Sequence, residues 1–215
     1  MPTRILLADD HTIMRQGLRQ ILEHEADFEI VAEAGSGLEA IEQAQEHQPD
    51  VAVMDIAMKE LNGIEATAQI LKRLPETLVL ILSMYSDERY VARAVKAGAR
   101  GYVLKNSAGD ELIRAVQAVR GGATFFSPSV AKVFRNGYSR LKDTAEAEDP
   151  FENLTERERQ VYQLLAEGNC NKDIANRLDL SLHTVETHRW RIMEKMSLHS
   201  MAELVLNAVR RGMVS

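Results

Sequence analysis

Near its start the chain carries Ile5-Leu6-Leu7-Ala8-Asp9-Asp10, a short apolar run that ends in two carboxylates. A continuous apolar run of this length is typical of a strand that is buried on both faces. The residues after it have apolar side chains at 14, 18, 21 and 22, which is the spacing of an amphipathic helix. The segment therefore predicts a buried strand followed by a helix, with two acidic side chains where the strand ends.

The same strand–helix pattern recurs four more times before residue 120. The further strands are expected in the apolar runs 29–32, 51–54, 78–82 and 101–104. Nearly continuous apolar strands that alternate with amphipathic helices indicate a parallel sheet covered on both faces. We therefore expect residues 1–120 to form an α/β domain with a five-stranded, parallel, doubly wound sheet.

Polar side chains follow four of the five expected strands. In sheets of this kind the ligand site lies beyond the carboxyl ends of the strands, and the side chains expected there are Asp9, Asp10, Asp55, Ser83 and Lys105. Converging carboxylates repel one another unless a cation lies between them, and oxygen ligands suit Mg²⁺. A carboxylate can also attack phosphorus in a transfer that needs positioning, a metal and positive charge. Each acidic residue alone is equally well explained as a helix cap or a solvated turn, but the full set favours phosphoryl transfer.

Over residues 1–120 this pattern resembles the CheY-like receiver domain of two-component response regulators. The resemblance implies that Asp55 is the phospho-acceptor. It also implies a Mg²⁺ site formed by Asp9, Asp10, Asp55 and the backbone carbonyl of Ala57. Ser83 and Lys105 would then contact the phosphoryl group.

Two further positions bear on the resemblance. Tyr102, three residues before Lys105, matches the aromatic switch residue of the family, and phosphorylation is expected to draw it inward together with Ser83. The family pattern D-x-x-M-P-x-x-x-G is matched by Asp55, Met58 and Gly63, but Lys59 stands where the family usually has Pro.

Two alternative functions remain open for this part of the chain. A haloacid-dehalogenase-like phosphatase also uses an Asp nucleophile, but it needs a second carboxylate two residues later, where this chain has Ala57. A regulator that works without phosphorylation is the other alternative, and Lys59 is the residue that suggests it. We expect a phosphorylated switch that is not a turnover enzyme.

Residues 121–150 are expected to form a linker with a helix near 129–141, followed by an acidic, polar stretch. Residues 151–215 carry helical patterns and no convincing strand. Thr155 and Glu158 form the signature of a capping box. A short helix at 172–178, a tight turn and a longer helix from Ser181 to about 196 are the signs of a helix-turn-helix, whose second helix enters the major groove.

Residues 151–215 resemble the LuxR-type effector domain, as the motifs Leu154-Thr155-x-Arg157-Glu158, Asn171-Lys172-Asp173-Ile174-Ala175, Thr184-Val185 and His188-Arg189 show. The whole chain is thus similar to the NarL/FixJ family of response regulators. The resemblance implies binding of double-stranded promoter DNA through Lys172, Thr184, Glu186, Thr187, His188, Arg189, Trp190, Arg191 and Lys195. Glu186, Thr187 and Trp190 would approach base edges, and Arg189, Arg191 and Lys195 would contact phosphates. A solvated helix face is the alternative for the charged residues, and packing against a neighbouring helix is the alternative for Trp190.

The expected last helix, from 201 to about 211, is apolar on more than one face. One apolar face would cover the core of its own domain, and the second would be left for a partner. In the family the equivalent helix pairs two effector domains on DNA. The resemblance therefore implies a homodimer, promoted by phosphorylation, through Met201, Val205, Ala208 and Val209.

Composition is consistent with a cytoplasmic protein. The net charge is −6, but residues 151–215 hold nine basic and nine acidic side chains, so the acidic excess lies before residue 151. The single cysteine, Cys170, excludes an intrachain disulfide. Apolar runs are far shorter than the ~20 residues that span a bilayer. We expect no membrane segment and, from the receiver resemblance, a histidine kinase as the phosphoryl donor.

Overall fold

The structure is a computed structural model that describes residues 1–132 and 149–214. The described chain divides into two compact units, one formed mainly by residues 1–132 and one by residues 149–214. Among the described residues, no helix combines the length and the apolar character needed to cross a membrane. The predicted domain limits 1–120, 121–150 and 151–215 stay predictions.

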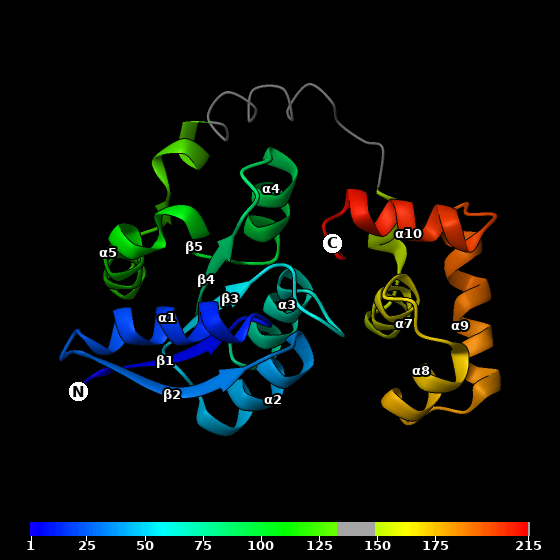
Figure 1. Ribbon diagram of the computed structural model, residues 1–215, viewed down its shortest axis with the longest axis horizontal. Helices are drawn as coiled ribbons and strands as arrows, with labels where there is room; N and C mark the ends of the chain where they lie inside the picture. The colour runs from blue at the N-terminus through cyan, green and yellow to red at the C-terminus, as the bar shows by residue number, and fades with distance from the viewer. Residues whose placement is uncertain (133–148, 215) are drawn as a thin grey trace. The chain divides into compact units, whose positions relative to one another are not determined.

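The first unit is built on a parallel sheet with the strand order β2-β1-β3-β4-β5-β6 (Figure 1). The strands are β1 (Thr3–Ala8), β2 (Phe28–Ala34), β3 (Val51–Asp55), β4 (Leu78–Ser83), β5 (Gly101–Leu104) and β6 (Phe125–Phe126). Each neighbouring pair is parallel. The prediction of a doubly wound parallel sheet is confirmed.

Helices cover both faces of this sheet. They are α1 (Thr12–Glu23), α2 (Gly37–His47), α3 (Gly63–Arg73), α4 (Glu88–Lys96) and α5 (Ala108–Arg120). On one face α1 and α5 pack against each other, and on the other α3 packs against both α2 and α4. Leu18 and Leu22 of α1 and Leu112 and Val116 of α5 share one buried core with alternate residues of the strands. Both faces of the central strands are buried, which explains why their sequences are apolar without alternation.

The sheet has six strands, so the prediction of five was wrong by one. The sixth, β6, has only two residues, and it pairs with Gly101 and Tyr102 of β5. Two residues are too few to carry a periodic signal, and β6 lies in the stretch that the sequence analysis assigned to the linker. Residues 128–132 are helical and begin the helix expected near 129–141. The rest of that helix lies outside the described residues.

Hydrogen bonds hold the chain after β6 to the first unit. The Ser127 backbone N–H donates to the Tyr102 carbonyl at 2.9 Å, and the Ser127 hydroxyl oxygen accepts from the Leu104 N–H at 3.1 Å. The same hydroxyl donates to the carboxylate of Glu111, which also accepts from Ser107 at 3.0 Å. Ser127 and Glu111 are both buried. This network, a buried carboxylate with hydroxyl donors, joins β5, α5 and the residues that follow β6.

Helices are the only regular secondary structure among the described residues of the second unit. It contains the 3-10 turn η2 (Pro150–Asn153) and the helices α7 (Glu156–Ala166), α8 (Asn171–Leu178), α9 (Leu182–Lys195) and α10 (Met201–Arg210). The predicted capping box is confirmed, because Thr155 and Glu158 exchange side chain–backbone hydrogen bonds at the start of α7. The turn between α8 and α9 passes through Asp179 in the left-handed region (φ 50°). The helical unit with its short α8, turn and longer α9 is the predicted helix-turn-helix arrangement.

Candidate functional site

The register of the sheet brings the predicted polar residues of the first unit together at the carboxyl-terminal ends of the strands. Ala8 pairs with Met54, Asp55 with Leu82, and Ser83 with Leu104. The carboxyl ends of β1, β3, β4 and β5 therefore lie at the same level. Asp9 and Lys105, which directly follow β1 and β5, are held at this edge beside Asp55 and Ser83.

Lys105 joins two of the carboxylates. Its Nζ lies 2.7 Å from Asp55 Oδ2 and 2.8 Å from Asp9 Oδ2. The site is enclosed, because Asp55 is 2% exposed and Asp9 is fully buried. Desolvation of the ions offsets much of the attraction between a buried ammonium and two buried carboxylates. The stability of the fold therefore does not explain this arrangement, which indicates a functional site.

Burial and repulsion perturb the acid–base behaviour of this group. Burial raises the pKa of Asp55, and the charges of Asp9 and Asp10 raise it further, while Lys105 acts in the opposite direction. Burial would lower the pKa of Lys105, but the Asp55 and Asp9 carboxylates outweigh it, so this pKa is raised. Lys105 therefore stays cationic, and three ionised carboxylates would carry more negative charge than one ammonium neutralises.

A divalent cation fits this excess of negative charge. Asp9, Asp10, His11 and Asp55 each offer one ligand atom, and the four atoms lie within 4.8 Å of one another. Three of them are carboxylate oxygens, the ligands that hard cations such as Mg²⁺ prefer. The acidic cluster could therefore hold a metal ion. Ala57 lies in the loop directly after β3, and its part as a carbonyl ligand stays a prediction.

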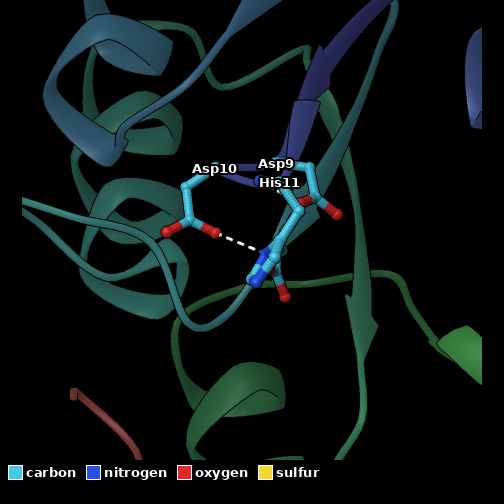
Figure 2. A group of neighbouring side chains, drawn as sticks. Asp9, Asp10 and His11 are labelled. Atoms are coloured by element: carbon cyan, nitrogen blue, oxygen red, sulfur yellow. Dashed lines mark hydrogen bonds and ion pairs between the residues drawn. The ribbon is translucent and has the colours of Figure 1, made fainter. Parts of the chain in front are cut away.

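His11 belongs to this cluster and was missed by the sequence analysis. Figure 2 shows its ring turned toward Asp10, and its Nδ1 lies 2.7 Å from Asp10 Oδ1. The His11 backbone N–H donates to Asp9 Oδ1 at 2.8 Å. The only available signal was the position of His11 directly after Asp9-Asp10.

Ser83 and Tyr102 are joined through Tyr85, which follows β4. The Tyr85 N–H donates to Ser83 Oγ at 3.0 Å, and the Tyr102 hydroxyl donates to the Tyr85 carbonyl at 2.6 Å. Burial raises the pKa of Tyr102, so its hydroxyl stays a donor. The Tyr102 ring is fully buried in this structure, and its expected inward movement on phosphorylation stays a prediction.

The loop between β3 and α3 passes close to Asp55. Asn62 caps α3, because its Oδ1 accepts from the N–H groups of Ile64 and Glu65. Gly63, the first helical residue, has no room for a side chain, since a Cβ there would lie 1.8 Å from the Asp55 carbonyl oxygen. The glycine in the predicted pattern is therefore required by a close approach of two backbones.

In the second unit, α9 presents most of the predicted DNA-contacting residues outward. Val185 and Ile192 face the core, as expected, while Glu186 and Arg191 are exposed. Trp190 is 63% exposed, so it does not pack into the described core of its own unit. Thr184, Thr187 and Arg189 are partly exposed on α9, and Lys172 is exposed at the start of α8.

Lys195 does not share this outward arrangement. Its Nζ lies 2.7 Å from Glu158 Oε2 and donates to the Asn153 carbonyl at 3.0 Å, and Glu158 is buried. The ammonium is thus paired with α7 and η2 in this structure, and the contact of Lys195 with DNA phosphate stays a prediction. Burial also lowers the pKa of His188, which is therefore mostly neutral at pH 7 and a weaker phosphate partner than an arginine.

The Glu158–Lys195 pair gives the second unit an expected sensitivity to acid. Burial would raise the pKa of Glu158, but Lys195 and the Thr155 N–H outweigh it and hold the pKa below its usual 4.5. Its contribution is therefore complete above pH 4.5 and is lost as the pH falls through the lower, folded value. Glu158→Gln is expected to cost about 1.5–3 kcal/mol of unfolding free energy at pH 7, the usual contribution of a hydrogen bond to a charged group, and less at pH 3. Urea titrations followed by fluorescence of Trp190, the only tryptophan, measure this; an equal cost at both pH values would contradict it.

The last helix, α10, divides its apolar residues between two faces. Leu204 and Ala208 are fully buried in the unit's core, whereas Val205, Leu206 and Val209 are exposed. Ala208 was predicted to contact a partner, and this is corrected, because it lies one turn from Leu204 on the inward face. Met201 is partly exposed.

The fold and the site define a class of protein: an α/β unit with an enclosed carboxylate–lysine site, followed by a helix-turn-helix unit. Residues 5–117 match the family model of the response regulator receiver domain, and residues 152–208 match that of bacterial regulatory proteins, luxR family. The chain belongs to the two-component response regulators that combine a receiver with a LuxR-type DNA-binding domain, and it is a transcriptional regulator.

Relatives and solved structures support this assignment along the whole chain. The oxygen regulatory protein NreC of Staphylococcus epidermidis (strain ATCC 12228) is 40% identical, with 98% of this chain and 99% of the relative covered. A LuxR-family response regulator from Aurantimonas sp. SI85-9A1 is 35% identical, with a TM-score of 0.62, and covers 65% of this chain and 99% of its own. The response regulator ChrA of a heme-sensing two-component system is 32% identical, with a TM-score of 0.53, and 99% of both chains is covered.

Proposed function

We propose that Asp55 accepts a phosphoryl group from a partner histidine kinase and that this modification controls binding of the second unit to promoter DNA. The proposed metal is Mg²⁺, held by Asp9, Asp10, Asp55 and the Ala57 carbonyl. The observation that carries the proposal is the buried Lys105 ammonium between Asp55 Oδ2 and Asp9 Oδ2. Burying these three ions adds little to the stability of the fold, because desolvation offsets their attraction. Phosphoryl transfer, in contrast, needs a carboxylate nucleophile with positive charge beside it.

The residues of the chain have separate parts in the transfer. An oxygen of the Asp55 carboxylate forms the bond to phosphorus, and the donor's nitrogen leaves. Lys105, already within 2.7 Å of Asp55, neutralises charge on the phosphoryl oxygens. A bound Mg²⁺ supplies further neutralisation of that charge.

The residues next to Asp55 do not match those of a haloacid-dehalogenase-like phosphatase. Turnover needs an acid–base residue near the nucleophile, and the position two residues after Asp55 holds Ala57. We therefore infer a stoichiometric switch and not a turnover enzyme. Labelling by an acyl phosphate that stops at one phosphoryl group per chain supports the switch, and steady release of inorganic phosphate would support the phosphatase.

The switch itself is inferred to act through Ser83. Its hydroxyl oxygen accepts a hydrogen bond from the Tyr85 N–H, and the Tyr85 carbonyl holds Tyr102. A phosphoryl group on Asp55 would attract the Ser83 hydroxyl and so compete for this arrangement. The loop before α4, and the surface that α4 and β5 form, would shift toward a second conformation.

The second unit is proposed to bind two-fold DNA sites in the cytoplasm as a homodimer. The outward face of α10, with Val205, Leu206 and Val209, is the proposed pairing surface, together with Met201. On α9, Arg189 and Arg191 are proposed to contact phosphates, and Glu186, Thr187 and Trp190 to approach base edges. Phosphate contacts would supply affinity, and base contacts would supply the choice of sequence.

Loss of one phosphate contact is expected to change the salt dependence of DNA binding. Arg191→Ala should reduce the slope of log affinity against log salt by about one unit, with a similar effect on all sequences. Trp190→Ala should instead lower the preference for the specific site and leave non-specific binding unchanged, because an apolar side chain reads a thymine methyl. Fluorescence anisotropy of labelled DNA at several salt concentrations measures both effects.

Arg73→Ala is the matched control for these variants, since Arg73 is an exposed arginine on α3 of the first unit. Its salt slope should equal that of the wild type. A slope that falls equally for Arg191 and Arg73 would contradict a specific part for α9 in DNA binding.

A further inference from the structure

The side chain of His11 contacts the carboxylate cluster and does not cap the helix that follows it. It is the N-cap residue of α1, yet its side chain makes no capping hydrogen bond. Its ring is turned instead toward the acidic residues, with Nδ1 at 2.7 Å from Asp10 Oδ1 and 3.4 Å from Asp9 Oδ1 (Figure 2). Helix capping therefore does not explain where this ring lies.

The distances between the ring nitrogen and the carboxylate oxygens are close to those between ligand atoms of one metal ion. Ligand atoms that share one ion lie about 3–4 Å apart, because each is about 2.1 Å from the metal. The four atoms of Asp9, Asp10, His11 and Asp55 lie within 4.8 Å of one another. Since His11 is exposed and Asp10 is partly exposed, small rotations of these side chains are open to them.

The charge of the site also favours a neutral nitrogen as the next ligand. Lys105 already neutralises one of the three carboxylates, and a dication neutralises the remaining two. A fourth carboxylate would restore the repulsion, whereas a neutral imidazole adds coordination without charge. Imidazole is a ligand that first-row transition metals accept readily, whereas Mg²⁺ prefers oxygen alone.

We propose that His11 is a further protein ligand of the metal ion through Nδ1 and that it raises the affinity of the site for transition-metal dications such as Mn²⁺ relative to Mg²⁺. This inference rests on the proposed function, because it needs the metal site formed by Asp9, Asp10 and Asp55. His11 is thus a residue that determines metal preference, while the carboxylates provide the site itself.

The decisive measurement is pulsed electron paramagnetic resonance of the full chain with bound Mn²⁺. A coupling to ¹⁴N is expected in the wild type and should be absent in His11→Ala. His24→Ala is the matched control, since His24 is an exposed histidine at the other end of α1, with its Nδ1 against the Gln20 carbonyl. It should keep the coupling. Because the His11 side chain does not cap α1, His11→Ala should keep the wild-type circular dichroism.

Binding constants for the two metals provide the second readout. His11→Ala is expected to weaken Mn²⁺ binding on the order of tenfold, as loss of a metal-site partner commonly does, while Mg²⁺ binding changes less than twofold. If His11 is only a cationic partner of Asp10, its removal would strengthen the binding of both ions equally and no nitrogen coupling would be seen. That result overturns the inference and leaves the carboxylate site intact. Failure of the wild type to bind either ion would overturn the proposed metal site and this inference together.

Discussion

Asp55→Asn is expected to abolish phosphorylation of the chain completely. The carboxylate of Asp55 is buried at the end of β3, within 2.7 Å of Lys105, and it is the proposed nucleophile. An amide has no charge and does not form a stable acyl phosphate, so no residual labelling is expected. Intact-mass spectra taken after incubation with an acyl phosphate and Mg²⁺ show the gain of one phosphoryl group directly.

The matched control for this experiment is Asp87→Asn. Asp87 caps α4 by accepting from the Arg89 N–H, and Asn caps helices about as well as Asp. This variant should be labelled like the wild type, with one phosphoryl group per chain. Labelling of Asp55→Asn at the wild-type level would mean that another residue accepts the phosphoryl group.

Gly63→Ala is expected to destabilise the first unit by about 3 kcal/mol or more. A Cβ at this position would lie 1.8 Å from the Asp55 carbonyl oxygen and 2.9 Å from the Met54 side chain. Overpacking ordinarily costs about 1–3 kcal/mol, and here the obstacle is mostly backbone, which a side-chain rotation cannot relieve. The loop after β3 has to move, so the rate of Asp55 phosphorylation should fall as well.

Urea titration followed by circular dichroism measures this loss, and Trp190 fluorescence, which reports the second unit, should not change. Gly17→Ala is the control, because nothing lies within 4 Å of a Cβ added to Gly17 in α1. That substitution should be neutral or stabilise the chain by about 0.5–1 kcal/mol, since alanine favours a helix. Equal stability for the two variants would show that the loop after β3 accommodates a side chain.

The sheet and the polar residues at the carboxyl ends of its strands could be predicted, because both depend on local sequence. Five strands appear as apolar runs, and parallel pairing places their carboxyl ends at one level. The meeting of Asp9, Asp55 and Lys105 follows from that rule without any knowledge of contacts. The strand β6 could not be predicted in this way, because its two residues are held by hydrogen bonds to distant parts of the chain, such as the Arg100 carbonyl.

The side-chain contacts of the second unit could not be predicted, for a different reason. Lys195 has the residue type and the helix position of a phosphate contact, but its charge is paired with Glu158, 37 residues earlier in the chain. Ala208 is apolar and lies on an apolar helix, and only the packing of the unit decides which face it occupies. The partner of a side chain is a property of the tertiary structure, and a motif alone does not contain it.

The short strand β6 also has a consequence for exchange of modules between regulators. A chimaera joined near residue 121 would take Phe125 and Phe126 away from β5 and leave the backbone of β5 unpaired, and such an uncovered strand invites pairing with other chains. It would also leave the Glu111 carboxylate without the Ser127 hydroxyl. A junction placed after Ser127 keeps both. Residues 125–127 therefore belong to the first unit, because they pair with β5 and with Glu111. We expect chimaeras joined after Ser127 to stay soluble and chimaeras joined before Phe125 to aggregate.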